Sequence, residues 1–309
     1  MSDGFAMWRL APGVSYLDLQ FCGRPRIIAT GVISGPGGVA LVDPGPQSTL
    51  PTLEACLNAG GHSLDDVGEI LLTHIHLDHG GVTGTLLGRY PRISVFVHER
   101  GAPHLANPAK LVASAGLLYG DQMDTLWGEV RPVPAGALTV VRGGERIAAA
   151  GREFEVVYTP GHASHHVSYM SRDADLAFIG DTGGVRLGPG SYTMPPTPPP
   201  DIDIEAWTDS LRRLAAWGCD TVFLTHFGPA APGRAHLLLF LENLEAATAL
   251  AKHSLALEGA DADREKWFAD EMRKVLLRNG TGDDVHAYQV ACRFDLNWRG
   301  LARYWRKKG

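Results

Sequence analysis

The sequence predicts an α/β fold of stacked layers, followed by a helical C-terminal extension. Short apolar runs typical of buried strands recur along the first part of the chain, and polar residues that can bind metals follow several of them directly. After His226 the strand patterns stop and long helical patterns begin. We therefore expect one layered domain over residues 1–235 and an extension over residues 236–309, which packs on the main domain or forms an oligomer contact.

The expected strands are short and are distributed along the whole main domain. They cover residues 14–19, 27–34, 39–42, 69–72, 93–97, 153–158, 167–170, 176–179 and 221–224. A glycine cluster separates the second and third of these runs. It lacks the Lys-Ser/Thr pair of a phosphate loop, so it predicts a hairpin turn.

Helical periodicity fills the intervals between the strands and the end of the chain. The connection over residues 98–134 is longer than a simple loop, so we expect helices within it. The amphipathic pattern that begins at Asp203 ends at Gly218, a helix stop signal. The expected helices cover residues 49–59, 109–119, a segment near 121–128, 203–217, 234–257, 261–277 and 285–305.

The most informative segment is the run Leu72-Thr73-His74-Ile75-His76-Leu77-Asp78-His79-Gly80-Gly81. Four side chains that can bind metal ions lie within six residues, where a buried strand turns into the next helix. A single tetrahedral ion cannot easily take four ligands from so short a loop. Two ions sharing the loop is the more natural interpretation, with His74 and His76 at one ion and Asp78 and His79 at the other. The alternative is a histidine-rich surface loop that binds nothing.

Three later strands end in residues of the same kind. Their last residues are Pro160-Gly161-His162, Gly180-Asp181 and Thr225-His226. Each pattern alone is weak, because Gly-Asp also ends many strands as a plain turn. Together, four strands would present seven candidate ligands at one end of a sheet.

This combination of motifs resembles the metallo-β-lactamase fold superfamily of metallohydrolases, over roughly residues 10 to 235. The early Ala40-Leu41-Val42-Asp43-Pro44-Gly45 is also similar to the superfamily's strand ending in an Asp-Gly turn. Within the superfamily the chain looks most like the glyoxalase II type. The resemblance implies a four-layer αβ/βα sandwich, in which His74, His76 and His162 bind a first metal. It implies that Asp78, His79 and His226 bind a second metal and that Asp181 bridges both.

The resemblance implies hydrolysis without a nucleophilic serine, and no G-x-S-x-G motif is present. We expect two divalent metal ions, zinc first, with iron and manganese as alternatives. A hydroxide bridging the metals would attack an ester, thioester, lactone or related carbonyl bond, and Asp78 and Asp181 would orient it or carry its proton.

Other functions of the same fold stay open as alternatives. Persulfide dioxygenases resemble this chain and use one iron, so they form the alternative from a different class. A phosphodiesterase or nuclease is a third option, and a metal-binding module without catalysis is a fourth. The lactonases of the family carry a pocket tyrosine three residues after the bridging aspartate, where this chain has Gly184. True β-lactamases generally lack the bridging aspartate.

The substrate pocket has weaker sequence signals than the metal site. A stiff proline-rich segment, residues 195–200, predicts a wall beside the site, and Tyr192 and Met194 just before it are candidates for the substrate pocket. His166 is a third candidate. Tyr119 and Trp127 are expected to form the opposite wall. The alternative for each of these residues is ordinary core packing.

Composition is consistent with an enzyme that acts on small molecules. The chain has 309 residues, a net charge of −6 and no basic stripe, so we expect no nucleic-acid partner. No stretch approaches the roughly 20 apolar residues that span a bilayer. Four scattered cysteines without a C-x-x-C pair predict a reducing cytoplasm. A homo-oligomer through the C-terminal helices is compatible with the sequence.

Overall fold

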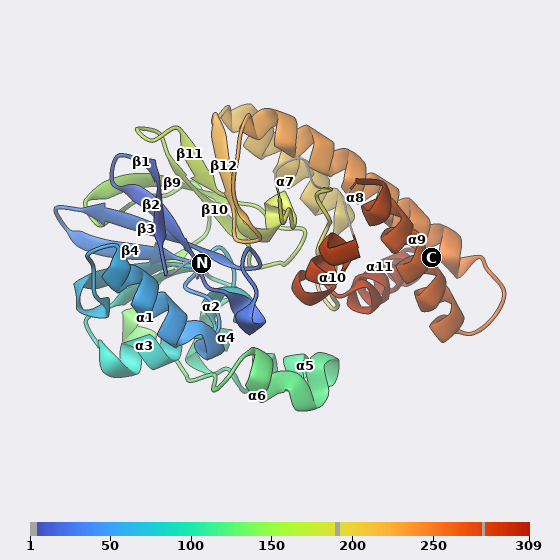
Figure 1. The fold of residues 1–309 in the computed structure, drawn as a ribbon, viewed down its shortest axis with the longest axis horizontal. Coiled ribbons are helices and arrows are strands. Elements are labelled where there is room, and N and C mark those ends of the chain that lie inside the picture. The colour runs from blue at the N-terminus through green and yellow to red at the C-terminus, as the bar shows by residue number, and fades with distance from the viewer. Residues whose placement is uncertain (1–4, 189–191, 280–281) are drawn as a thin grey trace.

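The computed structural model describes residues 5–188, 192–279 and 282–309, and its architecture is a sandwich of two mixed sheets (Figure 1). The first sheet has the order β1-β2-β3-β4-β5-β6-β7, and the second has the order β13-β12-β11-β10-β9-β8. The first sheet comprises β1 (Met7–Ala11), β2 (Val14–Asp18), β3 (Ala29–Gly35), β4 (Gly38–Val42), β5 (Val67–Leu71), β6 (Ser94–His98) and β7 (Leu138–Val141). The second comprises β8 (Arg146–Ala149), β9 (Arg152–Tyr158), β10 (Val167–Ser171), β11 (Leu176–Phe178), β12 (Thr221–Leu224) and β13 (Gly228–Ala230).

The strands divide their apolar side chains between two cores. In β4, Ala40 and Val42 belong to the core between the sheets, whereas Val39 and Leu41 belong to the core under the helices. This follows from the period of two along a strand, which sends successive side chains to opposite faces. From the second sheet, Phe178 packs into the core between the sheets. Both faces of each sheet are therefore covered, which makes four layers.

Helices form the two outer layers. Figure 1 shows α1 and α3 on the side of the first sheet and α7 and α8 on the side of the second. The helices are α1 (Leu50–Ala59), α2 (Leu77–Gly80), α3 (Thr83–Arg89), α4 (Ala102–Ala106), α5 (Ala109–Tyr119), α6 (Met123–Leu126), α7 (Ile204–Trp217), α8 (Gly233–Leu255), α9 (Asp261–Asn279), α10 (Gly282–Ala291) and α11 (Phe294–Lys308). Helices α5 and α6 lie in the long connection, as predicted, and α4, which was not predicted, precedes them.

The sequence prediction of a layered α/β sandwich with a helical extension is confirmed. One predicted helix was wrong. The segment over residues 285–305 forms parts of two helices, α10 and α11, which are separated at Cys292 and Arg293. Strands β1, β7, β8 and β13 were not predicted. β7 and β8 have few buried residues, so they lack a clear apolar run.

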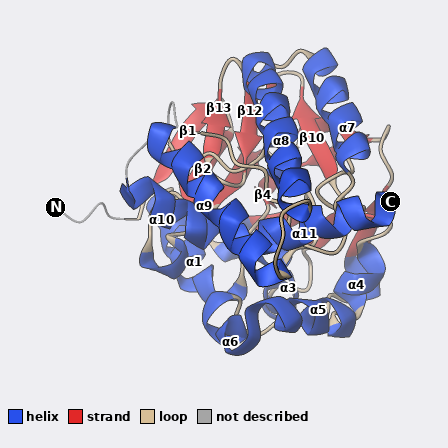
Figure 2. Cartoon of the chain, turned by 90° about the vertical axis from the view of Figure 1, so that its right-hand side faces the viewer, coloured by secondary structure: helices blue, strands red, loops and turns tan. Residues whose placement is uncertain are grey.

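The C-terminal helices contact the main domain at several points (Figure 2). His236 on α8 is hydrogen-bonded through Nε2 to the carbonyl of Gly183 at 2.8 Å, and the Tyr304 hydroxyl on α11 donates to Glu205 on α7 at 2.7 Å. The predicted boundary between residues 235 and 236 falls in the first turn of α8, and the division into a main domain and an extension stays a prediction. Among the described residues, no helix is both long and apolar enough to cross a membrane.

Candidate metal centre

Four loops at one end of the sandwich bring the predicted ligands together. His74, His76, Asp78 and His79 follow β5, His162 follows β9, Asp181 follows β11 and His226 follows β12. Parallel neighbours such as β11 and β12 end at the same edge of a sheet, so their last residues meet. All seven side chains lie in three overlapping groups whose donor atoms are within 4.8 Å of one another: His74, His76 and His162; His74, His79 and Asp181; and Asp78, His79 and His226.

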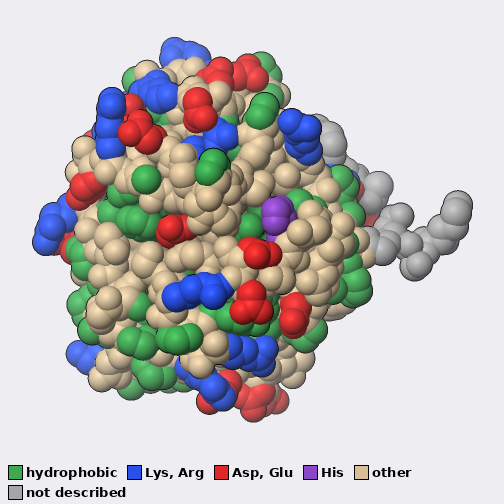
Figure 3. All heavy atoms as spheres, turned by 90° about the vertical axis from the view of Figure 1, so that its left-hand side faces the viewer, with side chains coloured by type: hydrophobic (Ala, Val, Ile, Leu, Met, Phe, Trp, Pro, Cys, Tyr) green, Lys and Arg blue, Asp and Glu red, His purple; other side chains and the backbone are tan. Residues whose placement is uncertain are grey.

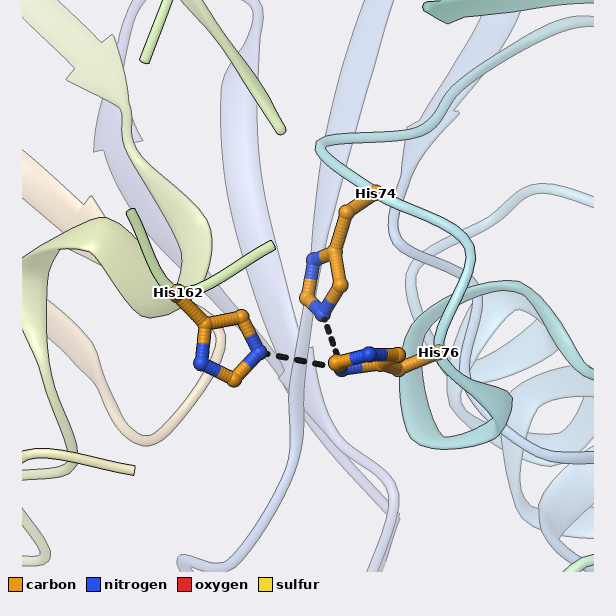
Figure 4. Close-up of side chains that lie close together, drawn as sticks. All are labelled: His74, His76 and His162. Atoms are coloured by element: carbon orange, nitrogen blue, oxygen red, sulfur yellow. Dashed lines mark hydrogen bonds between the residues drawn. The ribbon is translucent and has the colours of Figure 1, made fainter. Parts of the chain in front are cut away.

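The first group is formed by three imidazoles, whose rings point toward one another in Figure 4. Both His74 Nε2 and His162 Nε2 lie 2.9 Å from His76 Nδ1. His162 Nδ1–H donates to the carbonyl of Pro196 at 2.8 Å, so its Nε2 carries a lone pair. The Thr73 hydroxyl donates its own proton to Asp43, so at 3.2 Å it can only accept a hydrogen bond from His74 Nδ1–H. His74 Nε2 therefore also carries a lone pair.

Two lone pairs therefore face one ring nitrogen of His76. That nitrogen carries at most one proton, so at least one of the two 2.9 Å contacts has no hydrogen between its nitrogen atoms. A cation between the three nitrogens resolves this, because neutral imidazole is a ligand for Zn, Fe and Cu. The first group therefore fits a metal ion.

The second group combines two imidazoles with a carboxylate. Asp78 Oδ2 lies 3.3 Å from His226 Nε2 and 3.8 Å from His79 Nε2. His226 Nδ1–H donates to the carbonyl of Ile27 at 2.7 Å, so Nε2 is the ring atom that faces the carboxylate oxygens. His79 Nε2 is buried without a hydrogen-bond partner, as is Asp181 Oδ1. Such orphaned polar atoms are costly unless an ion binds them, so this group also fits a metal.

Asp181 lies between the two groups. Its Oδ2 is 3.3 Å from His162 Nε2 in the first group, while its Oδ1 is 3.3 Å from His79 Nε2 and 3.7 Å from His226 Nε2 in the second. One carboxylate thus directs one oxygen to each group.

Asp43, for which the sequence suggested no specific role, fixes this arrangement from behind. Its Oδ2 accepts hydrogen bonds from His79 Nδ1 at 2.8 Å and from the hydroxyls of Thr73 and Thr225, both at 2.7 Å. Its Oδ1 accepts the Thr73 backbone N–H at 2.8 Å. The carboxylate therefore connects the ends of β4, β5 and β12 and sets the tautomer that leaves His79 Nε2 free. The Asp-Pro-Gly turn after an apolar strand was the only sequence signal.

His162 is positioned by a glycine and a helix. Gly161 has φ +141°, and a Cβ built there would lie 2.2 Å from the Cβ of Trp207 on α7. Only glycine lets the turn pass so close to the helix. The Trp207 ring packs edge-on against His162 with centroids 5.6 Å apart, which limits the rotation of the imidazole.

The histidines of the two donor groups differ in the direction of their pKa shifts. Burial opposes the charged form of His79, but the carboxylates of Asp181, Asp78 and Asp43 raise its pKa well above the usual range. His226 follows the same pattern, with a raised pKa. In the first group, burial and the neighbouring imidazoles lower the pKa of His74 strongly and that of His76 to about 4.

The carboxyl groups are ionised throughout. Burial alone would raise the pKa of Asp78, but the charge of His79 and the hydrogen bond with His226 lower it to about 2. Burial is likewise outweighed at Asp181 by His79, His162 and His226, which hold its pKa well below the ordinary value.

A cavity of about 670 Å³ is lined by Asp78 and His226 of the second group and by His76 and His162 of the first. Its walls come from three parts of the chain: the loop around Phe21, the insertion with α5 and α6, and the C-terminal helices α10 and α11, which Figure 1 places on two sides of the centre. As predicted for the walls, Tyr119, Trp127 and the prolines at 196 and 198–200 line the cavity.

The three substrate-pocket residues predicted from the sequence are placed elsewhere. Met194 is fully buried in the core, and neither it nor Tyr192 lines the cavity. The proline-rich segment turns these two side chains away because Asn297 on α11 holds Thr197, accepting its N–H at 2.8 Å. His166 is buried behind His74, with the rings stacked at 5.1 Å, and it contacts the hydroxyls of Thr159 and Thr182.

Gly184 departs from the lactonase pattern for a steric reason. It has φ +80°, and a Cβ there would lie 2.4 Å from the ring of Phe240 on α8. A tyrosine at this position would need α8 to move.

A family model described as the metallo-beta-lactamase superfamily matches residues 23–226, which contain every candidate ligand. The chain belongs to this superfamily. It is 29% identical over 211 residues to the metallo-beta-lactamase fold-containing protein ST1585 of Sulfurisphaera tokodaii, a match that covers 67% of this chain and 76% of that protein.

Two further comparisons concern the fold and the glyoxalase II type. The solved structure of the metallo-beta-lactamase family protein TTHA1429 from Thermus thermophilus has a TM-score of 0.72 at 24% identity, covering 97% of this chain and 95% of the other, which supports the fold. A hydroxyacylglutathione hydrolase of Buchnera aphidicola subsp. Acyrthosiphon pisum is 33% identical over 113 residues, covering 37% of this chain and 32% of that enzyme. The glyoxalase II-like resemblance is therefore confirmed, over only part of each chain.

Proposed function

We propose that this chain is a dinuclear metal-dependent hydrolase that cleaves an ester, thioester, lactone or related carbonyl bond. The observation that carries the proposal is the position of Asp181, with one oxygen toward each donor group at 3.3 Å. A carboxylate between two groups of imidazoles is suited to bridging two ions. The similarity to a hydroxyacylglutathione hydrolase, an enzyme named for cleaving a thioester, supports the choice of bond.

The proposed ligands divide as the geometry groups them. His74, His76 and His162 would hold one ion, Asp78, His79 and His226 the other, and Asp181 both. Nitrogen and oxygen donors without thiolate favour zinc, with iron and manganese as alternatives. A metal pair bound there would supply a hydroxide at neutral pH and positive charge for the oxyanion that develops during acyl transfer.

The chain's own groups supply the remaining chemistry. Asp78 and Asp181 both face the cavity and are ionised, so their carboxylate oxygens can orient the attacking water and accept its proton. In the overall reaction, the water oxygen bonds to the carbonyl carbon, the bond from that carbon to the leaving oxygen or sulfur breaks, and the leaving group takes up a proton.

The proposal includes the setting in which the enzyme works. Its partner would be a small molecule, because the cavity is enclosed by three walls. Figure 3 shows acidic and basic side chains interspersed on one face of the molecule, with no basic patch for a nucleic acid there. Four free cysteines favour a cytoplasmic location. A homo-oligomer is compatible with the exposed leucines Leu238 and Leu239 on α8.

The test combines metal analysis with a substrate panel. We expect about two zinc ions per chain and turnover of thioesters, lactones or aryl esters by the zinc or manganese form. His76→Ala and Asp181→Ala should abolish turnover, while His62→Ala, in a turn outside all three donor groups, should leave it unchanged. One iron per chain with oxygen uptake would favour the dioxygenase alternative instead. Full activity after chelation would overturn the proposal.

A further inference from the structure

Two basic side chains that form no ion pair among the described residues line the cavity. Arg100 and Lys110 both line it and are exposed, and neither forms an ion pair with any described residue. Arg293, which also lines the cavity, is different because it pairs with Asp295 at 2.6 Å. Among the residues that the structure describes, the cavity therefore has two free cations.

Neither free cation has an evident structural purpose. The Arg100 guanidinium lies 5.9 Å from the centroid of the Tyr158 ring, which is itself stacked on His98 at 4.5 Å. This packing holds Arg100 in place without neutralising it. Lys110 is the second residue of α5, where a cation is disfavoured by the positive end of the helix dipole.

The opposite end of α5 is aromatic and apolar. Tyr119, the last residue of the helix, packs edge-on against Trp127 with centroids 5.0 Å apart, and Trp127 stacks on Phe21 at 5.5 Å. Between the two ends, Leu111, Ala115 and Leu118 line the cavity at helical spacing. Lys110 and Tyr119 are nine positions apart, which is about 13 Å at the usual helical rise.

Three acidic side chains also line the cavity, namely Asp78, Asp181 and Asp201. Asp78 and Asp181 belong to the donor groups of the metal centre. Asp201 forms no ion pair among the described residues and accepts hydrogen bonds from the backbone N–H and the hydroxyl of Ser164. Helix α5 itself has no acidic residue, so the charge that it contributes to the cavity, from Lys110, is positive.

We propose that the substrate is an elongated acyl compound with an apolar or aromatic acyl group at one end and an anionic group, carboxylate or phosphate, at the other. The acyl group packs against Phe21, Tyr119 and Trp127, the anion meets Arg100 and Lys110, and the scissile carbonyl lies at the metal centre, which opens into the same cavity. This inference rests on the proposed hydrolase function. It adds what the catalytic chemistry leaves open, namely the shape and the charge of the substrate.

The test uses thioesters that share one aryl acyl group and differ only at the end of the leaving thiol. One ends in a neutral amide, one in a carboxylate and one in a phosphate monoester. We expect kcat/KM to be about tenfold or more higher for at least one anionic thioester than for the amide, mainly through KM. Because the cations are exposed, the preference should shrink as ionic strength rises. Comparing the carboxylate with the phosphate identifies the anion.

Substitutions of Arg100 and Lys110 test whether these two residues cause the preference for anionic thioesters. Arg100→Gln and Lys110→Gln should each reduce the anionic preference several-fold and leave hydrolysis of the neutral thioester unchanged. Arg89→Gln is the matched control, because Arg89 is exposed, lies outside the cavity and forms no ion pair among the residues described. Equal kcat/KM for all three thioesters, or a preference that survives both substitutions, would overturn the inference while leaving the hydrolase proposal intact.

A binding measurement separates the two proposals. Thioether analogues of the same three compounds cannot be hydrolysed, so their affinity reports on the cavity alone. If no thioester is cleaved but the anionic thioethers bind more tightly, and Arg100→Gln removes the difference, then the hydrolase proposal fails and the charge assignment stands. If the neutral and anionic thioethers bind equally, the charge assignment fails.

Discussion

At the residue scale, the centre depends on which nitrogen of each imidazole is engaged. Asp43, Pro196 and Ile27 each bind the remote nitrogen of one histidine, His79, His162 and His226 respectively. Each contact leaves the other nitrogen directed at the donor groups. Since a partner behind the ligand raises its basicity and fixes its ring, these contacts determine metal affinity as much as the ligands do.

Asp43→Asn should weaken metal binding by about 10- to 100-fold. The amide nitrogen of asparagine cannot accept hydrogen bonds from Thr73, Thr225 and His79, so His79 can adopt the tautomer that blocks its metal-facing nitrogen. Asparagine tolerates the positive φ of 51° at this position, so the turn should persist. A competition titration against a chelator measures the effect, with the exposed Asp65→Asn as control. Equal affinities for both variants would contradict this role.

Acidification should remove the second ion before the first. His79 and His226 have raised pKa values, so in the metal-free protein they hold a proton to higher pH than His74 and His76 do, and a metal that binds there must displace it. His74 and His76, with lowered pKa values, are already neutral. Affinity at the second group should fall about tenfold per pH unit for each proton released. Metal content measured after dialysis between pH 8 and pH 6 checks this, and simultaneous loss of both ions would contradict it.

At the element scale, α7 links the core to the metal centre. Asp203 caps the helix by accepting the Ala206 N–H at 3.0 Å, and its own backbone N–H donates to the carbonyl of Gly161 at 2.9 Å. The first turn of α7 thus supports the turn that carries His162.

Asp203→Ala should lower the free energy of unfolding by about 1 kcal/mol, because it leaves a backbone N–H of the first turn without its cap. Asp209→Ala lies on the same helix and removes only an exposed ion pair with Arg212, so it should cost less. Urea unfolding of both metal-free variants makes the comparison. An equal cost for the two would show that the cap does not stabilise the helix.

The convergence of the candidate ligands follows from local sequence patterns, because each candidate follows an apolar strand, as Thr221–Leu224 precedes His226. That these side chains bind metal stays a prediction. The orientation of Tyr192 and Met194 does not follow from local patterns, since Asn297, about 100 residues later, holds the segment that follows them. The break between α10 and α11 has no glycine or proline to signal it. Contacts distant in sequence decided both features.

At the scale of the whole molecule, the metal centre joins the two sheets. His74, His76, Asp78 and His79 follow a strand of the first sheet, whereas His162, Asp181 and His226 follow strands of the second. Ions shared between these loops would connect the two halves of the sandwich in addition to the apolar core.

Removing metal should therefore lower the melting temperature of the whole protein. A ligand that binds only the folded state at 100 times its Kd stabilises it by about 2.7 kcal/mol. Thermal unfolding with EDTA, and then with increasing zinc, measures the shift. We expect a higher Tm at each zinc concentration until the sites saturate. A Tm that is independent of zinc would contradict binding at this centre.

The hydrogen bonds behind the candidate ligands also bear on which metal this centre would bind. The Asp43 carboxylate and the carbonyls of Pro196 and Ile27 hold three imidazoles by hydrogen bonds within the protein, so the orientation of these rings does not depend on which metal binds. A prearranged centre of this kind binds whichever suitable ion it meets first. The metal found in the purified protein should therefore follow the supply in the growth medium, with zinc and manganese cultures yielding differently loaded enzyme.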